Sequence, residues 1–179
     1  MDAVKARGQK AVALTDIWGV YGAVRFYRAA RDAGIQPVIG ARICLWDGSW
    51  ITLIAKTFRG YGNLCKIITA GMDNTGTDRP IVLNNHIRKW SGDLICLVGG
   101  YGSRTCVLAE KGDMEGLGTS LLPLKCIFAG ELFVVLKHHN LPGDRKTNQI
   151  LVQVAKRLKI QHAQASGSCS QHWRMSQAL

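Results

Sequence analysis

The chain has 179 residues, of which 47% are hydrophobic, so it is long enough to bury the core of one domain and disorder is not expected. Lys and Arg number 23 against 12 for Asp and Glu, which gives a net charge of +11. Diffuse positive charge attracts polyanions such as nucleic acid, but it does not define a binding site. No apolar run is long enough to cross a membrane and no signal-peptide core is seen, which predicts a cytoplasmic protein.

The hydrophobic pattern predicts strands and helices that alternate along the chain. Short apolar or β-branched runs predict strands over 11–16, 37–45, 50–56, 93–98, 131–136 and 161–165. Apolar residues at helical spacing predict helices over 21–33, 60–70, 105–128 and 144–160. We expect the third helical region to break near Gly116 and Gly118, and the last helix to have Asp144 as its N-cap. This order predicts an α/β domain with a mostly parallel sheet, either open or closed into a barrel.

The cysteines indicate the redox environment of the protein, and the C-terminal segment indicates where the folded domain ends. The six cysteines form no C-x-x-C pair and lie mostly within apolar runs: Cys44, Cys65, Cys96, Cys106, Cys126 and Cys169. This pattern predicts buried thiols in a reducing compartment. Residues 166–179 show neither strand alternation nor a helical stripe. We therefore expect a domain over 1–165 and a disordered or aberrant tail over 166–179.

Three groups of residues are candidates for a functional site. Asp16 follows a buried strand and precedes a helix, which is a usual position for active-site residues in parallel α/β folds, although a helix cap or a turn would also place an aspartate there. His138 and His139 end another strand, where only one of two adjacent side chains can point into a site. The glycines around 99–102 would suit either a phosphate or a simple turn.

Five strings keep a common order and spacing. They are Leu-Thr-Asp followed by Gly and Tyr-Gly within 11–26, Ala-Gly-Ile-Gln-Pro-Val-Ile-Gly-Ala at 33–41, Gly-Tyr-Gly-Asn-Leu-Cys within 59–65, Gly-Asp-Leu-Ile-Cys-Leu within 91–97, and His-His-Asn-Leu-Pro with a helix within 136–158. Together they resemble the PHP domain that opens bacterial DNA polymerase III alpha subunits and their error-prone relatives. The resemblance covers residues 2–165.

This resemblance implies a distorted β/α barrel whose strand ends carry ligands for a cluster of divalent metals. The family's first strand, with its His-x-His pair, would lie before Met1, so we expect an incomplete barrel with the first strand missing. Asp16 and His139 match ligand positions of the family. Ile17, however, stands where the family has a histidine, and Arg42 stands where it has a glutamate. Two ligands are too few for a metal cluster, and a permanent cation at Arg42 repels the ions.

The resemblance therefore favours a non-catalytic, structural domain of a DNA replication or repair polymerase, with no cofactor. The chain offers no counterpart of the polymerase palm domain, so a gene fragment is the expectation. Its partners would be DNA and the polymerase core or replication subunits. One alternative is a metal-dependent phosphoesterase or exonuclease, with Asp16 and His139 binding zinc, manganese or iron. Another is a basic DNA-binding module, whose contact residues the sequence leaves unknown.

Overall fold

The computed structural model describes residues 1–73, 79–100, 103–136 and 143–164, which form a six-stranded sheet with helices packed against it. The strands are β1 (Ala11–Ile17), β2 (Gln36–Cys44), β3 (Trp50–Ala55), β4 (Leu94–Gly99), β5 (Leu132–Leu136) and β6 (Gln161–Gln164). The helices are α1 (Asp2–Ala6), α2 (Ala23–Asp32), α3 (Phe58–Met72), α4 (Asn84–Trp90), α5 (Arg104–Lys111), α6 (Met114–Phe128) and α7 (Asp144–Arg157), and a 3₁₀ turn (Ala129–Glu131) precedes β5. The predicted strands and helices all occur near their expected bounds, whereas the tail expected at 166–179 lies outside the described residues.

The sheet has the strand order β1-β2-β3-β4-β5-β6 and mixes two kinds of pairing. The pairs β1–β2, β4–β5 and β5–β6 are parallel, whereas β3 is antiparallel to both of its neighbours. The connection from β2 to β3 is too short for a parallel crossover: Leu45 N donates to Ser49 O at 2.8 Å across a turn that contains Gly48 at φ +78°. The α/β class is confirmed, and β3 is the exception to the parallel sheet that the pattern predicts.

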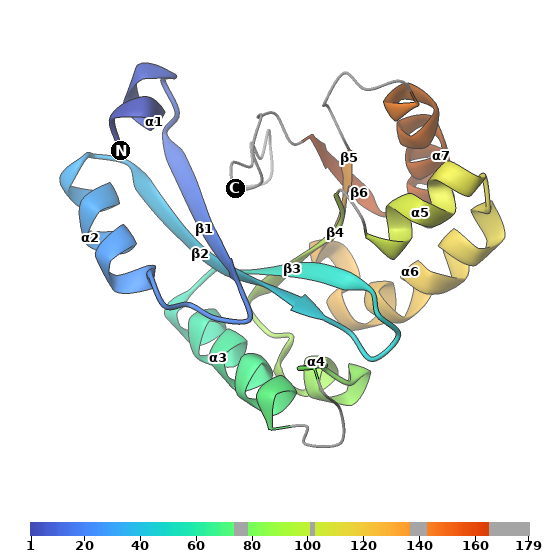
Figure 1. Cartoon of the computed structure of the whole chain (residues 1–179), viewed down its shortest axis with the longest axis horizontal. Helices are drawn as coiled ribbons and strands as arrows, with labels where there is room; N and C mark the ends of the chain where they lie inside the picture. The colour runs from blue at the N-terminus through green and yellow to red at the C-terminus, as the bar shows by residue number, and fades with distance from the viewer. Residues whose placement is uncertain (74–78, 101–102, 137–142, 165–179) are drawn as a thin grey trace.

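The helices lie around the outside of the curved sheet (Figure 1), so its two faces have different neighbours. The larger apolar cluster joins the sheet to the helices, with Ile43, Leu53, Val98 and Val134 from the strands and Leu64 among the helix residues. We call this side the helix face. The opposite side, which we call the inner face, carries a smaller cluster of Ile54, Ile95, Leu97, Phe133 and Val135, with Val38 packed against it. Among the described strands β1 and β6 do not pair with each other, so the sheet is open between them.

Two helix boundaries differ from the prediction. The break in the 105–128 region falls at Gly112, which ends α5 in a left-handed conformation at φ +76°. Asp113 then caps α6, because its Oδ1 accepts from Gly116 N at 2.8 Å. Gly116 is therefore inside α6, and the expected break there is wrong. The N-cap of α7 is Gly143 at φ +99°, so the expectation of Asp144 as the cap is also wrong, and Asp144 is the first helical residue.

Several features are absent from the sequence-based prediction. The helices α1 and α4 were not expected, nor was the parallel bridge between Leu45 and Val82 that precedes α4.

The described cysteines are free thiols. Cys96 and Cys106 are buried as predicted, and burial raises the pKa of the Cys96 thiol, whereas Cys126 is exposed because it lies on the solvent side of α6. Within the described ranges, none of the helices has the length and apolar character needed to cross a membrane.

Candidate functional site

The strand register assigns each candidate site residue to one face of the sheet. Neighbouring residues of a strand point to opposite faces, and register partners share a face. Ala41 and Ile43 belong to the cluster on the helix face, so Arg42 between them is on the inner face. Gly40 gives a second line of evidence: a Cβ at this position would lie 3.0 Å from Thr15 Cγ2 and 3.3 Å from Ile54 Cγ1, and Ile54 belongs to the inner cluster.

Asp16 lies at the carboxyl end of β1, as predicted, but it is on the helix face. Its register partner is Ala41, which belongs to the cluster on that face. A Cβ built at Gly22, the N-cap of α2, would lie 3.7 Å from Asp16 Oδ2 and 3.2 Å from the Leu14 side chain. Because Leu14 and Asp16 both approach the start of α2, the half-buried carboxylate is directed toward this helix and not toward the inner face.

Ile17 and Arg42 are register partners at the carboxyl ends of β1 and β2 on the inner face. The Ile17 side chain is 59% exposed. Trp18 N donates to Arg42 O at 3.0 Å, which continues the backbone pairing by one residue. The Arg42 guanidinium carbon lies 5.1 Å from the centre of the Trp50 ring, a cation–π distance. The two residues predicted to replace metal ligands therefore lie side by side, and the positive charge of Arg42 is held over an aromatic ring.

The donor set at these strand ends does not fit a divalent cation. On the inner face β1 and β2 end with Thr15, Ile17, Gly40, Arg42 and Cys44; none of these has a carboxylate or an imidazole, and Cys44 offers a single thiol. The carboxylate of Asp16 is on the other face. Divalent metals in proteins require several oxygen, nitrogen or thiolate ligands that converge on one point. Within the described ranges no cluster of three or more His, Cys, Asp or Glu side chains could hold a metal ion.

Other predicted site residues are placed only in part. His138 and His139 lie outside the described residues, so a ligand role for His139 stays a prediction. Gly99 has φ +110°, and a Cβ there would lie 2.7 Å from Val135 O, so close approach of β4 and β5 accounts for this glycine. Gly100 also has a positive φ, while the remainder of the glycine cluster lies outside the description.

Sequence reasoning missed the aromatic and basic residues around the β2–β3 hairpin. Trp46 and Trp50 flank the turn, and Arg104, the first residue of α5, donates from Nη1 to Asp47 O at 3.2 Å. The string Trp-Asp-Gly-Ser-Trp over 46–50 was a usable signal, because an Asp-Gly pair between apolar runs is typical of a hairpin. The contact with Arg104 spans 57 sequence positions and has no local signal.

One protein family matches most of this chain. The model of the PHP domain matches residues 1–139. The chain belongs to the PHP domain family. The resemblance found in the five strings is thereby confirmed.

Curated relatives of this PHP domain include two kinds of bacterial polymerase. It is 27% identical over 162 residues to the DNA polymerase III subunit alpha of Thermus aquaticus, which covers 82% of this chain and 13% of the relative. It is 31% identical over 172 residues to the error-prone DNA polymerase of Symbiobacterium thermophilum, covering 86% of this chain and 16% of the relative. The chain thus spans less than a fifth of the length of these relatives.

A solved structure supports the barrel-type fold of this PHP domain. An amidohydrolase from Chromobacterium violaceum, solved with bound sulfate and no metal, superposes with a TM-score of 0.55 at 13% identity, over 93% of this chain and 79% of that chain. At this identity the likeness concerns the fold alone. It agrees with the barrel-type α/β fold that the resemblance implies, and the described sheet is curved and open between β1 and β6.

Proposed function

We propose that this PHP domain is a non-catalytic module of a DNA polymerase of the DNA polymerase III alpha or error-prone type, acting in DNA replication or translesion repair. The names of its curated relatives support the setting. In that setting the domain would brace the polymerase core, and its partners would be DNA and the core or other replication subunits. The chain's own contribution would be packing and binding, with no hydrolytic step.

The observation that carries this proposal is the position of Arg42. Its guanidinium lies on the inner face at the carboxyl end of β2, beside Ile17, and is stacked on Trp50. The positive charge of this guanidinium would repel a divalent ion. Asp16 cannot offset this charge at close range, because its carboxylate is directed toward α2. The electrostatics of these strand ends therefore disfavour metal-dependent hydrolysis.

A hydrolase assay tests the proposal against the phosphoesterase alternative. The chain is incubated with p-nitrophenyl phosphate, and separately with single-stranded DNA labelled at its 5′ end, in the presence of manganese, zinc or iron(II). The Asp16→Ala variant serves as the matched control. We expect no turnover above that of the control with any metal. Metal-dependent hydrolysis that disappears in Asp16→Ala would overturn the non-catalytic proposal and establish the phosphoesterase.

A further inference from the structure

Arg42 has the geometry of an anion-binding residue. It is half-buried, its guanidinium is held over the Trp50 ring, and no described carboxylate forms an ion pair with it. Its register partner on β3 is Thr52, whose side chain is on the same face and buried. An arginine that is fixed by stacking loses little conformational freedom when it binds, and its planar group presents several N–H donors to one acceptor.

The β2–β3 hairpin brings a second arginine and an exposed aromatic ring to the same end of the sheet. Arg104 is exposed, and its bond to Asp47 O uses one of its N–H groups while fixing the side chain beside the turn. Trp46 is 59% exposed. Its backbone N donates to Val82 O at 3.0 Å, which anchors the residue although its ring is open to solvent. Leu45 before it is buried in the helix-face cluster, and Trp46 is the first residue of the turn that joins β2 to β3.

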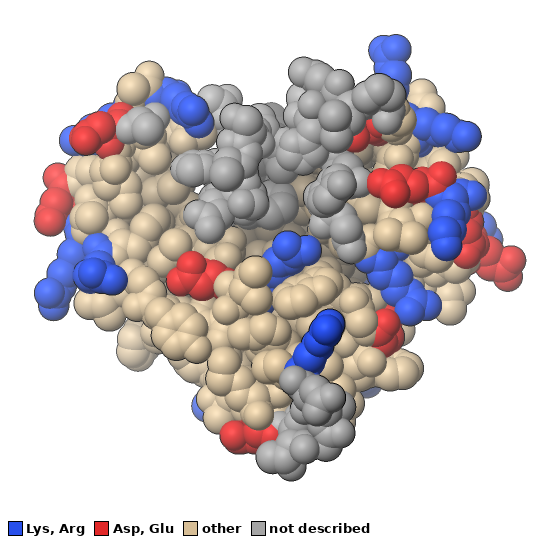
Figure 2. Space-filling view, viewed as in Figure 1, with Lys and Arg blue, Asp and Glu red and all other residues tan. Residues whose placement is uncertain are grey.

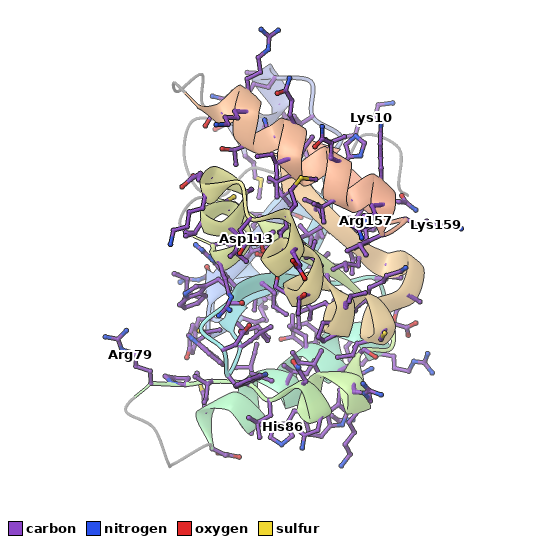
Figure 3. The ribbon with its side chains drawn as sticks, turned by 90° about the vertical axis from the view of Figure 1, so that its right-hand side faces the viewer. Lys10, Arg79, His86, Asp113, Arg157 and Lys159 are labelled. Carbon is purple, nitrogen blue, oxygen red and sulfur yellow. The ribbon has the colours of Figure 1, made fainter. Side chains whose placement is uncertain are left out.

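The charges of Asp47, Arg42 and Arg79 all act on the Cys44 thiol at the end of β2. Burial raises the pKa of the Cys44 thiol and Asp47 adds to the rise, whereas Arg42 and Arg79 oppose it. Arg79 precedes Val82, which pairs with Leu45 alongside β2. Figure 3 shows Arg79 extending away from the body of the protein. Arg42 and Arg104 thus lie at the hairpin end of the sheet together with the carboxylate of Asp47, and Arg79 lies on the neighbouring segment.

We propose that Arg42, Trp46 and Arg104, with Arg79 beside them, bind the phosphate backbone of a single-stranded nucleic acid while the Trp46 ring stacks on one base. We call these four residues the Arg42 rim. Charge complementarity between these arginines and a polyanion supports this ligand. Figure 2 shows Lys and Arg side chains spread over the face turned to the viewer, with Asp and Glu side chains among them. An exposed ring supports a single strand, because the faces of bases within a duplex are already stacked and cannot reach it. This inference rests on the proposed function, in which DNA is a partner, and names the residues that would bind it; loss of strand binding in the rim variants and the absence of hydrolysis are measured separately.

Fluorescence anisotropy of a labelled oligothymidine tests the rim. The titrations are made at one near-physiological salt concentration in EDTA, so that no divalent metal contributes. The variants are Arg42→Ala, Arg104→Ala and Trp46→Ala. The matched control is Arg28→Ala, which removes the same charge from an exposed position on α2, away from the hairpin. Thermal unfolding of each variant shows that it is folded, and exposed Arg104 keeps the test valid if Arg42→Ala does not fold.

We expect Arg42→Ala and Arg104→Ala each to weaken the affinity about tenfold, the usual loss for one charge-assisted contact. Trp46→Ala should weaken it at least about fivefold, the lower end for one stacked base. Arg28→Ala should change it by less than about twofold, because it removes only diffuse charge. Equal losses in Arg28→Ala and the rim variants would overturn the site.

Inorganic phosphate, added as a competitor, distinguishes a strand from a free phosphate group. If the rim binds a strand, phosphate should displace the oligonucleotide only weakly. Trp46→Ala should then lower the affinity for the oligonucleotide but leave the competition by phosphate unchanged. If phosphate alone displaces the oligonucleotide efficiently and Trp46→Ala retains full affinity, the strand proposal is overturned in favour of a small phosphate ligand.

Discussion

Arg42 and Asp16 lie on opposite faces of the sheet although they are only one register step apart. The family strings predict that Ile17 and Arg42 stand at ligand positions, and this assignment stays a prediction. The sequence was not sufficient to predict that the retained aspartate faces the helices. That outcome depends on which side of β1 packs against α2, and the register with Ala41 and the approach of Asp16 Oδ2 to Gly22 reveal it.

Asp93 provides a test at the scale of one residue. Its Oδ2 accepts from Arg59 Nε at 2.7 Å and from Thr57 Oγ1 at 3.0 Å. The hydrogen bond from Arg59, and to a smaller extent that from Thr57, holds the pKa of the Asp93 carboxyl below its usual value of 3.8. The ionised carboxylate therefore stabilises the folded state above the unfolded pKa, and this contribution is lost as the pH falls through the lower, folded-state pKa.

We expect Asp93→Asn to unfold at a lower temperature than the parent near neutral pH, by an amount typical of an exposed ion pair. The difference should shrink toward zero as the pH falls below 3.8. Differential scanning fluorimetry across this range measures it, with Asp32→Asn on α2 as a control. A difference that grows toward low pH would show that Asp93 does not stabilise the fold through its ionised form.

The helices and strands followed from periodicity, but breaks between adjacent helices did not. Three glycines, Gly112, Gly116 and Gly118, lie close together between the apolar stripes of α5 and α6. Composition does not distinguish a glycine that ends a helix from one inside it. Only Gly112 adopts the left-handed conformation, and Asp113 makes the capping bond that starts α6. Similarly, the antiparallel setting of β3 depends on the hairpin at 45–49, which the pattern of apolar residues does not determine.

Two glycine-to-alanine substitutions test this boundary. Gly112 has φ +76° and open space around its Cβ position, so Gly112→Ala should destabilise the protein by about 1 kcal/mol through backbone strain alone. Gly118 also has open space around its Cβ position but is inside α6, so Gly118→Ala should stabilise it by about 0.5 to 1 kcal/mol. Chemical denaturation measures both. Changes of the same sign in the two variants would contradict the assigned break.

The fold class of the whole molecule could be predicted because five strings keep the order and spacing of a known family. The face assignment could not, since it depends on which side of the sheet packs against helices that are far apart in sequence. Because the core lies on the helix face, a PHP fold can keep its core packing while residues on the inner face at the ends of β1 and β2 are substituted. The core depends on residues such as Ile43 and Leu53, on the face opposite Arg42. Substitutions at the inner strand ends therefore leave the packing that stabilises the domain intact.

The most direct measurement is the metal content of the chain after dialysis against manganese, zinc or iron(II), determined by inductively coupled plasma mass spectrometry. The parent chain is compared with Asp16→Ala and with a double variant that carries Ile17→His and Arg42→Glu. We predict far less than one ion per chain in the parent and in Asp16→Ala, and more metal in the double variant, because it removes the cation and adds two ligands on one face. One or more ions per parent chain, lost in Asp16→Ala, would contradict the account.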